Sequence, residues 1–282
     1  MRSFTVVSGA GRVRGRAGKA IAVTDVLCEI RDQVAVVTLN RPARRNALSG
    51  VLLTSLRLLL TELDPDPAVR VIVLTGADPA FCAGLDLTEL GQPESPLSGV
   101  ASGPVLPELS KPLIGAINGV AVTGGLELAL RCDFLIASER ARFADTHARV
   151  GVVPGGGMTI RLPELIGMDR ARRMSFTGDF IDAETAQRWG LVVEVVPHDA
   201  LLDRAREIAS TIAAIPAEYV RAVRNMYDEV SAMAGRDAWM AESRASRKWM
   251  EQRFDQSRLV KEREEIINRG RKQSGTKETG PA

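Results

Sequence analysis

The first two thirds of the chain alternate between short apolar runs and segments with helical spacing. The apolar runs predict strands over residues 34–39, 71–75, 113–122, 134–137 and 191–196. Between the first two runs, leucines recur at helical spacing and predict an amphipathic helix over residues 47–63; they are Leu48, Leu52, Leu56, Leu59 and Leu63. Strands that alternate with helices are typical of an α/β core, which we place at residues 25–200.

The remaining parts of the chain have different patterns. Residues 201–269 are helical in pattern, and their large apolar residues predict an oligomerisation region or a cover for the same chain; these are Trp239, Met240, Trp249 and Met250. Residues 1–24 hold five basic residues and no acid, so we expect a disordered basic arm. A start site placed too far upstream and an organellar targeting segment are the alternatives. Residues 270–282 are polar, and we expect a loose tail.

Composition excludes several classes of protein. The 282 residues are 45% hydrophobic and 26% charged with a net charge of +2, which gives no reason to expect nucleic acid as a partner. No run of 18 apolar residues is present, so we expect no membrane span. Cys28, Cys82 and Cys132 lack metal-type spacing and indicate buried thiols in a reducing compartment, here the cytoplasm. The chain has only two histidines, and we expect no metal site.

The segment most informative about chemistry follows the apolar run at 113–122. A turn of small residues contains Gly124 and Gly125 and begins a helix that carries one acid, Glu127. The first amides of a helix lack an internal partner and can point at developing negative charge. A carboxylate one turn further on is placed to transfer a proton beside that charge. The pattern favours an enzyme that forms an oxyanion, although such a glutamate is often only a partner of the helix dipole.

Two earlier segments add to this picture. In residues 40–48, Pro42 ends a strand, and Arg44 and Arg45 precede a helix; these arginines can bind phosphates or form a solvated charged loop. Residues 75–87 follow a buried strand and are crowded with small residues, which alone would indicate only a turn.

Together the three segments resemble the crotonase superfamily, the enoyl-CoA hydratase and isomerase family, over roughly residues 26–227. The family's coenzyme-A loop is similar to LNRPARRNAL, its first oxyanion segment to GADPAFCAGLDL, and its second to AINGVAVTGGLELALRCDF. The resemblance implies an α/β fold, a crotonase-like spiral of repeated β-β-α units with a helical C-terminal extension. It also implies an acyl-CoA thioester as the substrate and no separate cofactor.

The resemblance also assigns roles to individual residues. The backbone N–H groups of Leu85 and Gly124 would form an oxyanion hole for the thioester oxygen, where two aimed amides stabilise an enolate. Glu127 matches one of the family's two catalytic glutamates. Nine residues would bind the substrate or its coenzyme A: Arg44, Arg45, Ala47, Leu48, Ala83, Gly84, Asp86, Leu87 and Thr123. Within this set, Asp86 stabilises its loop or lies beside the substrate, and Thr123 stands where the family usually has glycine and is expected to pack.

The chain departs from the family at the position of the second glutamate, which is His147. Histidine transfers protons near neutral pH, so we expect it either to replace that acid or to fill the pocket wall. Asp145 would orient His147 or act as an acid itself.

We therefore predict an enoyl-CoA hydratase of fatty-acid metabolism that adds water to a 2-enoyl-CoA. The alternatives are an enoyl-CoA isomerase with Glu127 as its single base, and a non-catalytic acyl-CoA binding protein. By analogy with the family we expect a homotrimer or a dimer of trimers.

Overall fold

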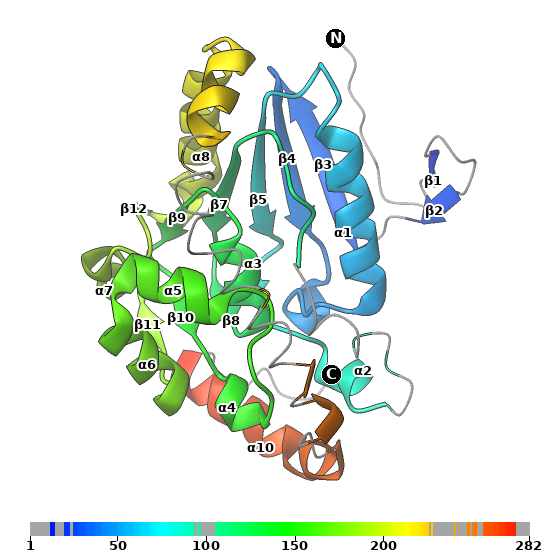
Figure 1. Ribbon diagram of the computed structural model, residues 1–282, viewed down its shortest axis with the longest axis vertical. Helices are drawn as coiled ribbons and strands as arrows, with labels where there is room; N and C mark the ends of the chain where they lie inside the picture. The colour runs from blue at the N-terminus through cyan, green and yellow to red at the C-terminus, as the bar shows by residue number, and fades with distance from the viewer. Residues whose placement is uncertain are drawn as a thin grey trace.

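The computed structural model describes residues 25–92, 105–225 and 256–274, together with residues 12–14, 20–22, 95, 97, 227, 240, 247–248 and 250–252. Two sheets form its centre (Figure 1). The larger sheet has six strands in the order β12 (Glu194–Val196), β9 (Phe134–Ser138), β7 (Leu113–Ile117), β5 (Val71–Gly76), β4 (Val34–Leu39) and β3 (Val26–Arg31). Neighbouring strands are parallel except β3 and β4, which are antiparallel.

The smaller sheet has four short strands. Their order is β11 (Ile181–Asp182), β10 (Arg142–Ala144), β8 (Val120–Val122) and β6 (Ala80–Cys82). Strands β6, β8 and β10 are parallel, and β11 pairs antiparallel with β10.

The chain visits the two sheets in turn. Strands β5, β7 and β9 lie in the large sheet, and each is followed by a strand of the small sheet and then by a short helix; these helices are α2 (Leu87–Leu90), α3 (Gly124–Leu130) and α4 (His147–Val150). This repeat confirms the expected spiral of β-β-α units.

The prediction of one strand over 113–122 was wrong, because the run divides into β7 and β8 in different sheets. The break lies at Asn118 and Gly119, where the backbone packs so closely on the preceding loop that a Cβ on Gly119 would lie 2.4 Å from the carbonyl oxygen of Pro79. Apolar residues flank the break on both sides, so hydrophobicity alone does not reveal it.

Alternating residues of the large sheet face two separate cores. On one face, Ala35 and Val37 pack with the leucines of α1 (Gly50–Leu63). On the other, Val34 and Val36 pack against α8 (Leu201–Ala213), and Figure 1 shows the two helices on opposite sides of the sheet. Helix α1 begins three residues later than predicted, because Ser49 caps it and accepts a hydrogen bond from the Leu52 amide at 3.1 Å.

Further helices with assigned bounds lie in the described residues. They are α5 (Met158–Ile166), α6 (Met168–Thr177), α7 (Ala183–Trp189), α10 (Gln256–Ser274) and two 3₁₀ helices, Pro42–Arg44 and His198–Ala200. Figure 1 shows α10 beside α4. No helix within the described residues is long and apolar enough to cross a membrane.

The two ends differ from the expected arm and tail. Strands β1 (Arg12–Arg14) and β2 (Ala20–Ala22) pair antiparallel within the segment expected to be disordered. Helix α10 continues to Ser274, past the expected start of the tail at residue 270. The rest of residues 1–24 and residues 275–282 lie outside the described part, as do Trp239 and Trp249.

Candidate active site

The candidate site lies at one edge of the small sheet, where three adjacent parallel strands end. Register pairs Cys82 with Ala121 and Val122 with Ala144, so β6, β8 and β10 end side by side. The segments that follow them begin at Ala83, Thr123 and Asp145. Sheet pairing thereby brings together segments that are about 20 to 40 positions apart in the sequence, and ligands of parallel sheets bind at this carboxyl edge.

The structure brings the backbone amides of Leu85 and Gly124 close together. A Cβ on Gly124 would lie 3.6 Å from the Leu85 nitrogen, and one on Gly84 would lie 3.7 Å from the Gly124 nitrogen. Leu48 pairs with the same loop, because its amide donates to the Gly84 carbonyl at 2.7 Å and its carbonyl accepts from the Asp86 amide at 3.0 Å. The intervening N–H of Leu85 therefore faces away from Leu48, towards Gly124. Gly124 is the first residue of α3, so its amide has no partner within the helix.

Glu127 is buried beside these two amides, with 5% of its surface exposed. One carboxylate oxygen, Oε1, accepts hydrogen bonds from the amides of Gly155 at 3.3 Å and Gly156 at 2.8 Å. A Cβ on Gly156 would lie 2.9 Å from the Glu127 carboxylate, so only glycine permits this approach. The backbone hydrogen bonds favour the ionised carboxylate and leave Oε2 for other partners.

His147 faces the second oxygen of Glu127. Its Nε2 lies 3.7 Å from Glu127 Oε2, and its Nδ1 lies 2.6 Å from Asp145 Oδ1. The other oxygen of Asp145 accepts a 2.5 Å hydrogen bond from the Ser175 hydroxyl on α6. The four side chains form a continuous chain in which the two ends of the imidazole contact different carboxylates.

Asp145 fixes the orientation and tautomer of His147. Burial raises the pKa of Asp145, but the hydrogen bond and charge of His147 and the hydrogen bond from Ser175 outweigh it and lower that pKa below its usual value. An ionised carboxylate only accepts, so Nδ1 of His147 donates to it, and Nε2 is the nitrogen that faces Glu127.

A cavity of about 580 Å³ is lined in part by His147, and a smaller one of about 30 Å³ lies against Glu127. All nine residues assigned to substrate binding line one cavity or the other: Arg44, Arg45, Ala47, Ala83, Gly84, Asp86, Leu87 and Thr123 the larger, and Leu48 the smaller. Glu262, Glu265 and Arg271 of α10 also line the larger cavity. The pKa of Arg45 is lowered, first by burial and then by the positive charge of Arg271, which lines the same cavity.

Asp86 also has a structural role. Its Oδ2 lies 3.1 Å from Nη2 of Arg41, and its Oδ1 accepts the Thr88 amide at 3.0 Å at the start of α2. Nη1 of Arg41 in turn donates to the Ala47 carbonyl at 2.6 Å. Asp86 and Arg41 therefore fasten the two cavity-lining loops to each other.

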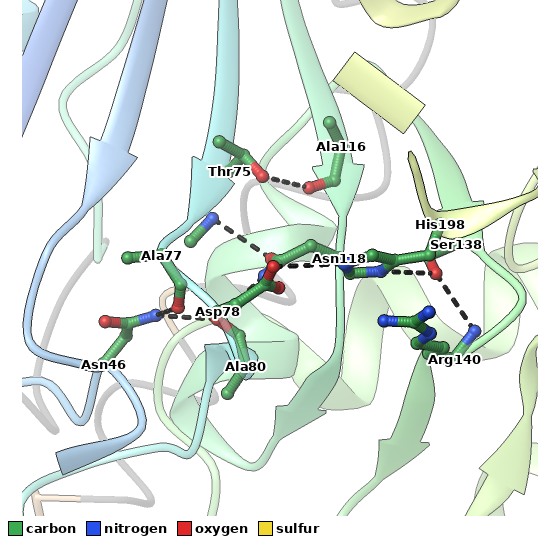
Figure 2. Close-up of polar contacts among 11 residues, drawn as sticks. Asn46, Thr75, Ala77, Asp78, Ala80, Ala116, Asn118, Ser138, Arg140 and His198 are labelled. Atoms are coloured by element: carbon green, nitrogen blue, oxygen red, sulfur yellow. Dashed lines mark hydrogen bonds and ion pairs between the residues drawn. The ribbon is translucent and has the colours of Figure 1, made fainter. Parts of the chain in front are cut away.

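The second histidine belongs to a separate polar network at the edge of the large sheet (Figure 2). Nδ1 of His198 lies 3.0 Å from the Ser138 hydroxyl, and Nε2 lies 3.1 Å from Oδ2 of Asp78. The Asn118 amide donates to the other oxygen of Asp78 at 2.9 Å. Although the residue types match those of a hydrolytic triad, Ser138 is fully buried and its oxygen also accepts the Arg140 amide at 3.0 Å. This network joins the β5–β6 loop to the ends of β9 and β12.

Several neighbours of the site were not predicted from the sequence. Ser175, Gly155, Gly156 and Arg271 reach the site only through tertiary packing, although the glycine run at 155–157 marks a backbone that another group can approach closely. Within the described residues, no group of three or more histidine, cysteine or acidic side chains could hold a metal ion.

The fold and the site together define a class of protein: spiral α/β proteins in which two backbone amides approach each other beside a buried glutamate and a buried histidine. The chain belongs to the enoyl-CoA hydratase/isomerase family, whose family model matches residues 29–265.

Named relatives are similar over most of their length. The chain is 40% identical over 197 residues to a short-chain-enoyl-CoA hydratase of Clostridium acetobutylicum, covering 67% of this chain and 76% of the relative. It is 39% identical over 218 residues to an (E)-benzylidenesuccinyl-CoA hydratase of Thauera aromatica, covering 75% and 83%. The crystal structure of an enoyl-CoA hydratase from Mycobacterium smegmatis has a TM-score of 0.74 and 49% identity, and covers 80% of this chain and 98% of that one. The chain is an enzyme of this hydratase and isomerase type.

Proposed function

We propose that the protein adds water across the double bond of a 2-enoyl-CoA thioester. The observation that carries the proposal is the pair of proton-transfer groups, Glu127 and His147, facing each other at 3.7 Å beside the amides of Leu85 and Gly124. Hydration needs one group to take a proton from water and another to deliver a proton to the α-carbon. The amides then hold the charge that develops on the thioester oxygen.

In the proposed reaction Glu127 is the base and His147 is the acid. Backbone amides favour the carboxylate form of Glu127, and ionised Asp145 favours the imidazolium form of His147. Glu127 Oε2 takes one proton from water, and the hydroxide oxygen bonds to the β-carbon. The electrons of the double bond move towards the thioester oxygen, and Nε2 of His147 then gives its proton to the α-carbon. A proton passed from Glu127 back to His147 restores the starting state.

The second group favours hydration over the two alternatives. An isomerase needs only one base, and a binding protein needs neither group. In this chain His147 is held by Asp145 at 2.6 Å and aimed at Glu127, which is more organisation than a pocket wall requires.

The coenzyme A would extend along the larger cavity. Arg44, Arg45 and Arg271 supply positive charge for its phosphates, while main chain near Ala47 and Ala83 supports its adenine. No cofactor is required in this proposal, because the thioester itself makes the α-carbon acidic.

We also propose a trimer or a dimer of trimers in the cytoplasm. Tyr219, Val223 and Tyr227 are exposed at four-residue spacing, which places them on one face of a helical segment. Such an apolar stripe is suited to contact with another subunit, and sedimentation of the purified protein tests it. The three free cysteines, Cys28, Cys82 and Cys132, support a reducing compartment.

The test is steady-state hydration of crotonyl-CoA, followed by the loss of enoyl-thioester absorbance. We expect Glu127→Gln and His147→Gln each to lower kcat by at least about 100-fold, because each removes one proton transfer. Glu184→Gln, which changes an exposed glutamate of α7, serves as the matched control. Conversion of a 3-enoyl-CoA that survives His147→Gln would favour the isomerase. Thioester binding without turnover, indifferent to Glu127→Gln, would favour the binding protein.

A further inference from the structure

The residue before Gly124 has a strained backbone. Thr123 has φ 54° and ψ −116°, in the left-handed half of the conformational map. Glycine enters this region freely, whereas a β-branched side chain there is an outlier. Such strain persists only where the surroundings maintain it, and it concentrates at functional sites. The contacts of the Thr123 side chain therefore indicate which part of the site depends on this strained backbone.

The Thr123 hydroxyl bonds to the segment that carries His147. Its Oγ1 lies 2.5 Å from Oγ1 of Thr146 and accepts the Thr146 amide at 3.3 Å. The backbone amide of Thr123 donates to the Ala144 carbonyl at 3.0 Å. The side chain thus continues the pairing of β8 with β10 one step beyond the last backbone pair of those strands.

The two threonines occupy equivalent places in the site. Thr123 directly precedes Gly124, whose amide faces Leu85, and Thr146 directly precedes His147. Thr123 is 8% exposed, and both residues line the larger cavity. Thr123 is buried and Thr146 is partly buried, so the hydrogen bond between their hydroxyls lies at the wall of the cavity.

We propose that the Thr123–Thr146 hydroxyl pair is a strut that sets the position of the Gly124 amide relative to the His147 imidazole. This inference rests on the proposed hydratase function. The two threonines are positioning residues, because they act through Gly124 and His147 and not on the reacting atoms. A shift of about 1 Å between two such groups can lower a rate about 100-fold.

Kinetics of isosteric variants test the strut. In Thr123→Val and Thr146→Val the shape is kept and the hydroxyl is lost, so we expect kcat for crotonyl-CoA to fall roughly 10- to 100-fold with KM within about threefold. Thr123→Ser keeps the hydroxyl and should stay within about threefold of wild type. The double variant should be no slower than the slower single variant, because both remove one interaction. Thr61→Val, which removes an exposed hydroxyl on α1, is the matched control.

Thr123→Gly separates a positioning role from simple packing. It relieves the strain, so its melting temperature should not fall, while its kcat should fall like that of Thr123→Val. A raised KM with unchanged kcat would overturn the proposal and assign the hydroxyls to substrate contact. Valine and glycine variants with wild-type kcat would also overturn it.

Hydrogen exchange tests the strut without turnover. We expect the amides of residues 123–127 to exchange faster in Thr123→Val and in Thr146→Val than in wild type. Unchanged exchange in both variants would contradict the strut even if the wild-type enzyme hydrates crotonyl-CoA. A wild-type enzyme that does not hydrate crotonyl-CoA, with exchange faster in both variants, would instead contradict the proposed function alone.

Discussion

Asp145→Asn isolates the charge that the proposed mechanism places behind His147. An asparagine can keep the three contacts of Asp145, since its carbonyl oxygen can accept from the ring and the backbone amide of His147 while its amide group donates to the Ser175 hydroxyl. The geometry is retained and only the negative charge is removed. The variant therefore reports how much a positively charged His147 depends on its partner.

The magnitude follows from the kind of hydrogen bond that is lost. A hydrogen bond to a charged group contributes about 1.5–3 kcal/mol and a neutral one about 0.5–1.5 kcal/mol. The difference of about 1–1.5 kcal/mol corresponds to a fall in kcat of roughly 5- to 12-fold. Asp145→Ala removes the whole interaction, about 1.5–3 kcal/mol, so kcat should fall roughly 10- to 150-fold.

The assay is steady-state hydration of crotonyl-CoA, with melting temperature to confirm folding. Asp182→Asn, at the exposed start of α7, is the matched control because it removes an aspartate whose pKa is also lowered by local hydrogen bonds. Wild-type kcat in Asp145→Asn would refute the reasoning, because His147 would then not carry positive charge in the rate-limiting step.

Three further predictions use the same structure. Ser175→Ala should lower kcat by less than the roughly 10- to 150-fold expected for Asp145→Ala, because it removes one hydrogen bond of the Asp145 carboxylate and leaves that carboxylate beside His147; equal losses would contradict this ranking. Arg45→Ala and Arg271→Ala should raise KM for CoA thioesters, more at low salt than at high salt and with kcat little changed, whereas Arg188→Ala on α7 should do neither. The pKa of Asp145 is lowered in the folded protein, so its ionised form stabilises the fold fully above a pH of about 3.9, the pKa of an unfolded aspartate. This stabilisation is lost as the pH falls through the lower pKa of the folded state. The free energy of unfolding should therefore decrease less steeply with falling pH in Asp145→Asn than in wild type.

The sequence predicted the strands that form continuous apolar runs. Strand β4 has the predicted bounds, and β5 and β9 each extend one residue further. Strands β6, β10 and β11 were not predicted, because two or three residues are too few to show a period. These short strands exist through pairing in the small sheet, which is a tertiary effect.

The sequence likewise predicted only part of the candidate site. Leu85, Gly124, Glu127 and His147 lie in segments with recognisable small-residue turns or acids, and the structure brings them together. The residues that hydrogen-bond to this group could not be predicted. The helical pattern around Ser175 indicates only which residues face the core, and the Ser175 hydroxyl reaches Asp145 because of how α6 packs in the fold. Their roles in catalysis remain predictions.

The most direct measurement is a crystal structure of the Glu127→Gln variant with crotonyl-CoA bound. The account predicts the thioester oxygen within about 2.7–3.1 Å of both the Leu85 and Gly124 nitrogens, with the double bond facing the side chains of both residue 127 and His147. A thioester oxygen that contacts neither amide, or a double bond remote from His147, would contradict it.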